Sequence, residues 1–225
     1  MISLLLLVVS TGSDQLVESA CDRKCPPIKE KAINVHLVAH SHDDTGYRKT
    51  VDDYYYGLRN DASAGGIQYT IESVLDALER NPSRIFNQVE IAFFWRWWRE
   101  ASNRDRARMT RLIHNGQFNF LLGGWCMNDE ALVSYKDMIE QNGLGLRWLR
   151  DTFGCASRPR AAWQIDTFGH TRGQAEMFSF FGYDALYFAR LDLEELAERV
   201  LERNGEVIWK GKSSLVGSSL HYKLV

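Results

Sequence analysis

Long apolar segments are scarce in this 225-residue sequence. The one nearly unbroken apolar run, residues 4–9, is too short to cross a bilayer as a helix, which takes about 20 residues. No second run approaches that length, so we predict no transmembrane segment. An Asn-x-Ser/Thr glycosylation site is also missing, because Pro82 disqualifies the match formed by Asn81 and Ser83.

A strong imbalance of charge is missing as well. The 27 Lys and Arg residues are offset by 29 Asp and Glu residues, so electrostatics give no reason to expect nucleic acid or an anionic membrane as a partner. Internal repeats and low-complexity stretches are absent too. Aromatic side chains, in contrast, make up 12% of the chain and include seven Trp. They indicate either a well-filled core or ring faces that stack on sugars.

The N-terminus is typical of a secretory signal peptide, which we assign to residues 1–20. Its apolar run is followed by small and polar residues, although no Lys or Arg precedes it. A buried N-terminal strand is the alternative. Secretion permits disulfides, but the sequence does not fix how the four cysteines pair: Cys21, Cys25, Cys126 and Cys155.

Short β-like runs alternate with longer helical patterns along the rest of the chain. The expected strands are residues 34–39, 89–94, 118–122, 161–166 and 185–188. The expected helices are residues 69–80, 97–115, 129–152, 172–181 and 193–204. This alternation predicts an α/β fold with a mostly parallel sheet, either open or closed like a barrel. Functional residues of such folds gather in the loops that follow the strands.

The loop after residues 34–39 is rich in metal-binding side chains. It places two His and two Asp within the five residues 40–44. His42 and Asp44 are two positions apart, so in an extended backbone both side chains point to the same side. Imidazole and carboxylate together suit zinc. The alternative is a polar loop in which the aspartates cap a helix.

Asp166 ends the strand expected at residues 161–166. Catalytic carboxylates of α/β folds are found at such strand ends. Asp166 also completes a three-residue metal site with His42 and Asp44, which leaves a further coordination position open. The alternative is that Asp166 caps the helix expected after it.

Five motifs, in order, resemble glycoside hydrolase family 38, the α-mannosidases. They read VHLVAHSHDDTGYRKTVDDYYYG, VEIAFFWRWW, GGWCMNDEALVSY, RPRAAWQIDTFGHTRGQAEMF and GYDALYFARLD. The match covers residues 30–210 and is more similar to the lysosomal branch than to the Golgi branch. The resemblance implies a seven-stranded β/α barrel-like catalytic domain, a secretory, lysosomal or secreted location, and a mannose-containing oligosaccharide as substrate.

The resemblance also implies roles for particular residues. It assigns His42, Asp44 and Asp166 as ligands of Zn²⁺, and Asp166 as the catalytic nucleophile of a retaining α-mannosidase as well. Tyr47, Asp129 and Arg190 are implied to bind substrate.

Three positions depart from the family pattern. Tyr47 stands where the family usually has Trp, and it offers a smaller stacking face. Gln164 and Thr167 stand where His and Pro are usual beside the nucleophile. We expect these changes to alter the rigidity of the loop without removing its carboxylate.

The tail at residues 211–225 does not continue the family pattern. We therefore expect a barrel that is incomplete at its C-terminal end, without the family's acid/base Asp and fourth zinc ligand. A catalytically inactive zinc- or mannose-binding fragment is one alternative. A metal-dependent polysaccharide deacetylase is another, but the five ordered motifs argue against it. The oligomeric state is not determined by these patterns.

We expect the 225-residue chain, expressed alone, to hydrolyse oligomannose very poorly. General acid catalysis contributes about 10²–10⁴ in rate, so the leaving group would depart without that assistance. Turnover of an activated aryl α-mannoside should be the easiest to detect. The assay compares the chain with Asp166→Asn, each with added zinc. Robust hydrolysis of oligomannose that Asp166→Asn abolishes would contradict this expectation.

Overall fold

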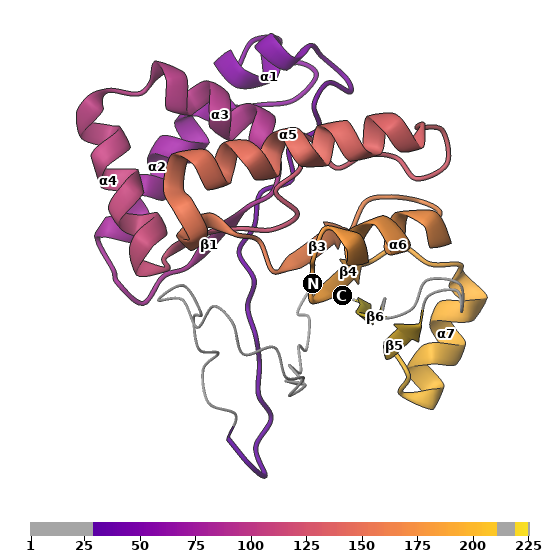
Figure 1. Cartoon of the computed structure of the whole chain (residues 1–225). Coiled ribbons are helices and arrows are strands. Elements are labelled where there is room, and N and C mark those ends of the chain that lie inside the picture. Colours follow the sequence, from indigo (N-terminus) through magenta and orange to yellow (C-terminus); the bar gives the residue numbers. More distant parts are fainter. Residues whose placement is uncertain (1–28, 211–218, 225) are drawn as a thin grey trace.

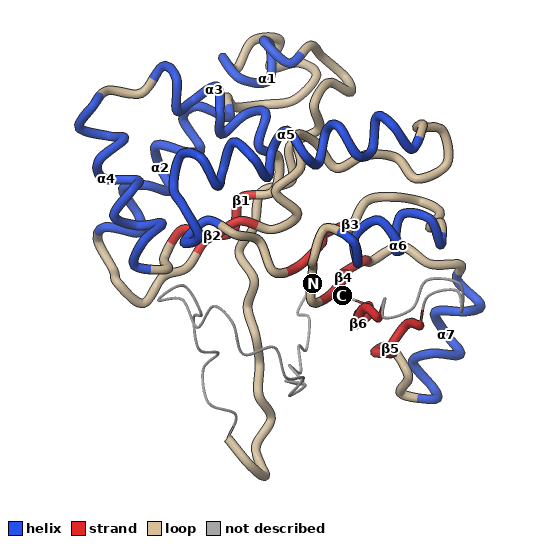
Figure 2. Tube along the Cα trace, viewed as in Figure 1, coloured by secondary structure: helices blue, strands red, loops and turns tan. Residues whose placement is uncertain are grey.

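The computed structural model describes residues 29–210 and 219–224 (Figure 1). The expected signal peptide and Cys21 and Cys25 lie outside the described residues. The helices are α1 (Val51–Tyr56), α2 (Ile67–Glu79), α3 (Ile91–Glu100), α4 (Asn103–Asn115), α5 (Tyr135–Phe153), α6 (Arg172–Phe180) and α7 (Leu193–Glu202). The strands are β1 (Phe86–Gln88), β2 (Phe118–Phe120), β3 (Ala161–Gln164), β4 (Ala185–Phe188), β5 (Glu206–Lys210) and β6 (Ser219–Leu224). Figure 2 shows the helices around the short strands.

Several helices begin where a short polar side chain caps the first turn. A side-chain oxygen of each cap accepts a hydrogen bond from a backbone N–H that the helix itself leaves unpaired. The caps of α1, α4, α5, α6 and α7 are Thr50, Ser102, Ser134, Thr171 and Asp192. The sequence therefore fixes where these helices start, and the loops before them keep defined positions.

The strands form two small sheets. β1 pairs in parallel with β2. β3 pairs in parallel with β4, and β4 pairs in parallel with β6. β5 lies at the edge of that sheet and pairs antiparallel with β6. The mixed α/β fold is confirmed, but the described residues do not form a closed seven-stranded barrel, because the longest run of paired strands is the four-stranded sheet.

Backbone contacts link the two sheets into one ordered series. His40 forms a parallel bridge with Asn87 beside β1. The N–H of Leu122, just after β2, donates to the carbonyl of Ala161 at the start of β3. The spatial order of these segments, which is His40, β1, β2, β3 and β4, is therefore the same as their order along the chain. Within each pair the strands are parallel, so the carboxyl ends of β1 and β2 lie together, as do those of β3 and β4.

The helices α2–α5 bury one large core, and β3, β4 and α6 enclose a second. The first is dominated by aromatic rings, with Phe94 within 6.4 Å of six other ring centroids. The second centres on Trp163 and Phe178. The abundant aromatics thus mainly fill cores.

Two strand predictions were wrong. Residues 89–94 are mostly the start of α3, whose Ile91, Phe93 and Phe94 are fully buried. A short apolar run does not distinguish a buried strand from a buried helix. Residues 34–39 form no strand, since among the described residues this segment has only the bridge at His40, and Leu37 is 82% exposed.

The helix expected at residues 97–115 is also divided in two. α3 ends at Glu100, and Ser102 caps the start of α4. The helix expected from residue 129 begins later, at Tyr135, because Ser134 caps it. β2, β3, β4, α6 and α7 lie within two residues of the predicted bounds.

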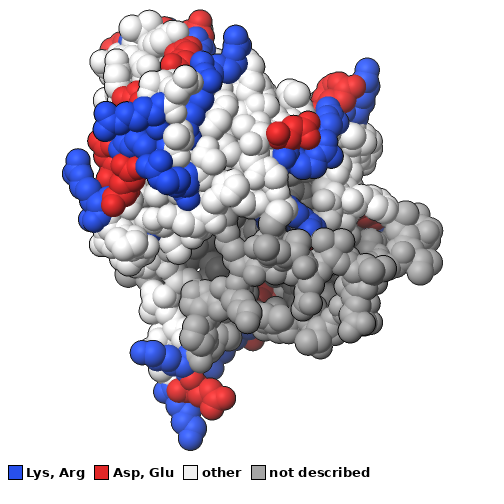
Figure 3. Space-filling view, turned by 60° about the vertical axis from the view of Figure 1, so that its left-hand side comes forward, with Lys and Arg blue, Asp and Glu red and all other residues white. Residues whose placement is uncertain are grey.

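Acidic and basic side chains are mixed on the surface. Arg108 of α4 lies 2.6 Å from carboxylate oxygens of both Asp76 and Glu79 on α2. Figure 3 shows the same mixture, with blue and red atoms interleaved rather than gathered by sign. No helix within the described ranges has the length and apolar character needed to cross a membrane.

Gly145 allows α5 to pack against the loop after β2. A Cβ atom at this position would lie 2.1 Å from the carbonyl oxygen of Gly123, whereas one at Gly143 would meet only the mobile end of Arg147, at 3.0 Å. We expect Gly145→Ala to lower the free energy of unfolding by about 2 kcal/mol, since overpacking against backbone is costly. Gly143→Ala should raise it by about 0.5–1 kcal/mol. Urea unfolding followed by circular dichroism tests both, and equal effects would contradict this packing.

Candidate metal centre

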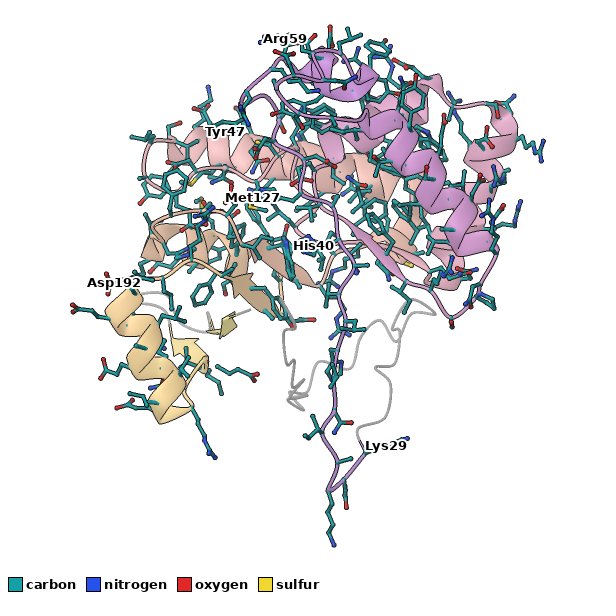
Figure 4. All side chains as sticks on the ribbon, turned by 180° about the vertical axis from the view of Figure 1, so that it is seen from behind. Lys29, His40, Tyr47, Arg59, Met127 and Asp192 are labelled. Carbon is teal, nitrogen blue, oxygen red and sulfur yellow. The ribbon has the colours of Figure 1, made fainter. Side chains whose placement is uncertain are left out.

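Two of the segments that carry predicted site residues follow strands, and a third follows an isolated bridge. His42 and Asp44 come just after the bridge at His40. Figure 4 shows the chain rising from Lys29 to His40 and continuing toward Tyr47. Farther along the chain, the register pairs Gln164 of β3 with Phe188 of β4. Two residues beyond each of these lie Asp166 and Arg190, so the register itself brings those two side chains together.

Three predicted residues converge on one point. One possible ligand atom each from His42, Asp44 and Asp166 lie within 4.8 Å of one another. Nε2 of His42 is 3.4 Å from Oδ2 of Asp166 and 3.7 Å from Oδ1 of Asp44. Ligands at zinc bond lengths around a tetrahedral ion are about 3.4 Å apart. The three side chains therefore fit a shared zinc ion with only small movements.

Asp166 divides its two oxygens between opposite neighbours. Oδ1 accepts from Nε of Arg190 at 2.9 Å and from Nη2 at 2.5 Å. Oδ2 faces His42. The guanidinium thus fixes the orientation of the carboxylate and leaves the other oxygen for a metal. The Asp166 side chain is 37% exposed, so a substrate could reach it.

Tyr47 and Asp129 lie outside this cluster. The Tyr47 side chain is 77% exposed on the loop between Asp44 and α1, where its ring has a free face. Oδ2 of Asp129 accepts from the N–H groups of Ala131 and Leu132, at 2.8 and 2.5 Å. That carboxylate closes a turn of its own loop. Substrate binding by Tyr47 and Asp129 stays a prediction.

Glu130, which the sequence pattern did not single out, is turned inward from the same loop. Its side chain is 2% exposed. One oxygen lies 3.0 Å from Nδ1 of His170, and the other accepts from the N–H of Thr171 at 2.7 Å. The only signal in the sequence was its place beside Asp129 in the same motif. Two adjacent carboxylates have the same chemistry, and only the fold shows which one is buried.

The two unusual residues around Asp166 also contact this buried carboxylate. The amide of Gln164 donates to Oε1 of Glu130 at 3.3 Å, and the Thr167 hydroxyl donates to the same atom at 3.5 Å. Both side chains are buried. Gln164 and Thr167 are therefore integrated into the hydrogen-bonded support of the loop.

A cavity of about 260 Å³ opens beside the metal centre. Its walls are His42, Asp44 and the connection between α1 and α2, including Gly65 and Gly66. Backbone and carboxylate groups line it, so it suits a small polar ligand.

Two further carboxyl groups are Asp43, in the loop of residues 40–44, and Glu90, which contacts that loop through Ser41. Burial raises the pKa of Asp43 to about 6 from its ordinary 3.8, against the opposing charge of His42. Burial and then the charge of Asp43 raise the pKa of Glu90 to about 8 from its ordinary 4.5. The Ser41 hydroxyl donates to Glu90 at 3.2 Å. Burial and the neighbouring acid both disfavour the charged form of Glu90.

Glu90 should make stability fall as the pH rises. Because its pKa is higher in the folded state, the protonated form favours folding, so its contribution is fully present below about pH 4.5 and is lost as the pH approaches about 8. Glu90→Gln keeps a neutral side chain throughout. We expect its melting temperature to decline less over this range than that of the wild type. Glu72→Gln, at an exposed position of α2, is the control, and parallel curves for Glu90→Gln and wild type would contradict the assignment.

Comparison with known proteins agrees with this geometry. Residues 32–223 match the N-terminal domain of glycosyl hydrolases family 38. The lysosomal alpha-mannosidase of Cavia porcellus is 47% identical over 191 residues, which cover 85% of this chain and 19% of that protein. The lysosomal alpha-mannosidase of Dictyostelium discoideum is 42% identical over 189 residues, 84% of this chain and 18% of its own length. The chain thus spans about a fifth of the relatives it matches.

Solved structures show the same fold. An alpha-mannosidase from Enterococcus faecalis V583 superposes with a TM-score of 0.64 at 15% identity, over 83% of this chain and 19% of that one. A 4-alpha-glucanotransferase from Thermococcus litoralis reaches 0.56 at 14% identity, over 84% and 27% of the two chains. At such identities the likeness concerns the fold alone, but the family match spans most of the chain and leaves no support for a deacetylase. The chain belongs to glycosyl hydrolase family 38, as part of that family's N-terminal domain.

Proposed function

We propose that this chain contributes the metal site and the nucleophile of a retaining, zinc-dependent α-mannosidase. Its substrates are terminal α-mannosyl residues of glycoprotein N-glycans or related oligomannosides. The convergence of His42, Asp44 and Asp166 is the observation that carries the proposal. The names of the relatives support the substrate.

The donor set suits zinc. One imidazole and two carboxylates are common zinc ligands, and the separations of 3.4 and 3.7 Å from Nε2 of His42 are close to those of a tetrahedral site. When bound, zinc supplies a Lewis acid that holds neighbouring sugar hydroxyls, such as the axial 2-hydroxyl and the 3-hydroxyl of mannose. That pair of hydroxyls gives selectivity for mannose.

Asp166 acts as the nucleophile in this proposal. A carboxylate oxygen forms a bond to the anomeric carbon while the bond from that carbon to the leaving oxygen breaks, and a glycosyl ester results. A second carboxyl group, about 5 Å away in retaining enzymes, gives its proton to the leaving oxygen. The same group then takes a proton from water while the water oxygen bonds to the anomeric carbon and the ester bond to Asp166 breaks, which releases mannose with its configuration retained. Arg190 keeps the attacking carboxylate oriented.

We also propose that the two sheets are consecutive parts of a seven-stranded β/α barrel. The order His40, β1, β2, β3, β4 places neighbours along the chain side by side, as barrels do. A closed barrel would need further strands in addition to those described.

A secretory location, lysosomal or extracellular, completes the proposal. Cys155 is disulfide-bonded, and stable disulfides are typical of oxidising compartments. The relatives' names point to the lysosome. A signal peptide at residues 1–20 would direct the chain there.

A mechanism-based label tests the function. 5-Fluoro-α-D-mannosyl fluoride keeps the mannose hydroxyls and has a leaving group that needs little protonation. We expect zinc-loaded protein to gain one covalent sugar on Asp166, detected by mass spectrometry of peptides. Asp166→Asn cannot form the ester, and Asp44→Asn should label far more slowly because the site loses a metal ligand.

Asp151→Asn, at an exposed position near the end of α5, should label like the wild type. The corresponding gluco reagent should label weakly, since its 2-hydroxyl is equatorial. Zinc binding without any label on Asp166 would instead support the alternative, a zinc- or mannose-binding fragment without catalysis.

A further inference from the structure

Glu130 is a buried carboxylate surrounded by donors. It accepts from the Thr171 N–H at 2.7 Å, from Gln164 at 3.3 Å and from Thr167 at 3.5 Å, and it lies 3.0 Å from His170. Burying a carboxylate is costly unless its oxygens are well paired. So complete a set of partners indicates a side chain whose position is tightly fixed.

His170 extends this contact to the next loop. Its Nδ1 faces Glu130 and its Nε2 lies 3.0 Å from the carbonyl oxygen of Arg190. Both partners are acceptors, so a ring that carries a proton on each nitrogen satisfies both. Burial acts to lower the pKa of His170, but the hydrogen bond and charge of Glu130 outweigh it and the pKa is raised. The ring therefore bridges two loops, and both contacts favour its protonated form.

Three loops meet at this bridge. Glu130 follows β2, the segment from Asp166 to Thr171 follows β3, and Arg190 follows β4. His170 contacts the carbonyl oxygen of Arg190, and the guanidinium of Arg190 donates to Oδ1 of Asp166. The chain of contacts thus starts at a buried anchor and ends on the carboxylate at the metal centre.

We propose that Glu130, acting with His170, is a positioning residue that sets the orientation of the Asp166 carboxylate for metal binding. The inference rests on the function proposed above, because it gives Asp166 a metal to bind. Glu130 touches neither metal nor substrate. It acts through the loop on which Asp166 lies and through Arg190.

Glu130→Gln is the informative substitution. The amide keeps the size of the side chain but has one acceptor oxygen, so it cannot receive both His170 and the Thr171 N–H on separate oxygens. His170→Asn is a milder second variant, whose side chain is too short to join Glu130 to the Arg190 carbonyl. Met109→Ala is the matched control, because it removes a fully buried side chain from the core of α2–α5 and leaves the loops intact.

The probe is zinc alone, titrated into the full 225-residue chain in competition with a chromophoric chelator, with melting temperatures measured in parallel. We expect Glu130→Gln to weaken zinc binding about 10–100-fold, as residues that orient metal ligands do. His170→Asn should weaken it less. The double variant should lose less than the product of the two single losses, because the two residues act as one unit. Met109→Ala should lower the melting temperature without changing zinc affinity.

Each other outcome overturns the inference in a recognisable way. If Glu130→Gln binds zinc like the wild type but melts earlier, as Met109→Ala does, Glu130 is only structural. If Glu130→Gln fails to fold, His170→Asn decides, and unchanged zinc affinity in that variant refutes the bridge. If the wild-type chain binds no zinc, the proposed metal site itself fails. A failure of positioning alone would leave zinc binding by the wild type intact.

Discussion

The carboxylate of Asp166 is placed between the guanidinium of one residue and the imidazole of another, and the candidate site depends on that division. Arg190 takes one oxygen and His42 faces the other. The backbone sets this up, because the pairing of Gln164 with Phe188 brings the two loop residues into register. A shift of one residue in that pairing would turn one of the side chains to the opposite face of the sheet.

Two buried glutamates near this site illustrate different ways to keep a carboxyl group away from water. Glu130 accepts from four surrounding groups. Glu90 has the Ser41 hydroxyl as a donor and Asp43 as a neighbouring acid, and its pKa rises to about 8. Hydrogen bonds offset desolvation in the first case, and proton uptake avoids it in the second. The first arrangement fixes loops, whereas the second makes stability depend on pH.

Much of the fold followed from local signals, and the errors have identifiable physical causes. β3 and β4 were predicted well because their apolar runs are bounded by polar loops. Residues 89–94 were assigned to a strand because burial on all sides hides the helical period of α3. The short helix α1 was missed, although the capping box of Thr50 and Asp53 marks its start. Pairing of the strands was beyond the reach of any local pattern.

The candidate site was predictable to the extent that residue type and loop position identify it. His42, Asp44 and Asp166 have side chains of types that bind metals and lie in loops, and the structure brings them together. Glu130 shares its chemistry with Asp129, and nothing in one sequence tells which of two adjacent acids turns inward. The surroundings of Glu130 depend on contacts with residues that lie 34 to 41 positions away in the sequence.

The unusual residues beside Asp166 follow from the same buried anchor. Gln164 and Thr167 stand where the family usually has His and Pro, yet both donate to Glu130. A proline at residue 167 would stiffen the loop by fixing φ, and Thr167 lacks that constraint. Its single hydroxyl proton is shared between Glu130 and the carbonyl oxygen of Gln164, which is nearer at 3.2 Å and closes the turn around Asp166. Side-chain hydrogen bonds to a fixed carboxylate thus supply, around Asp166, the rigidity that a proline ring would otherwise provide.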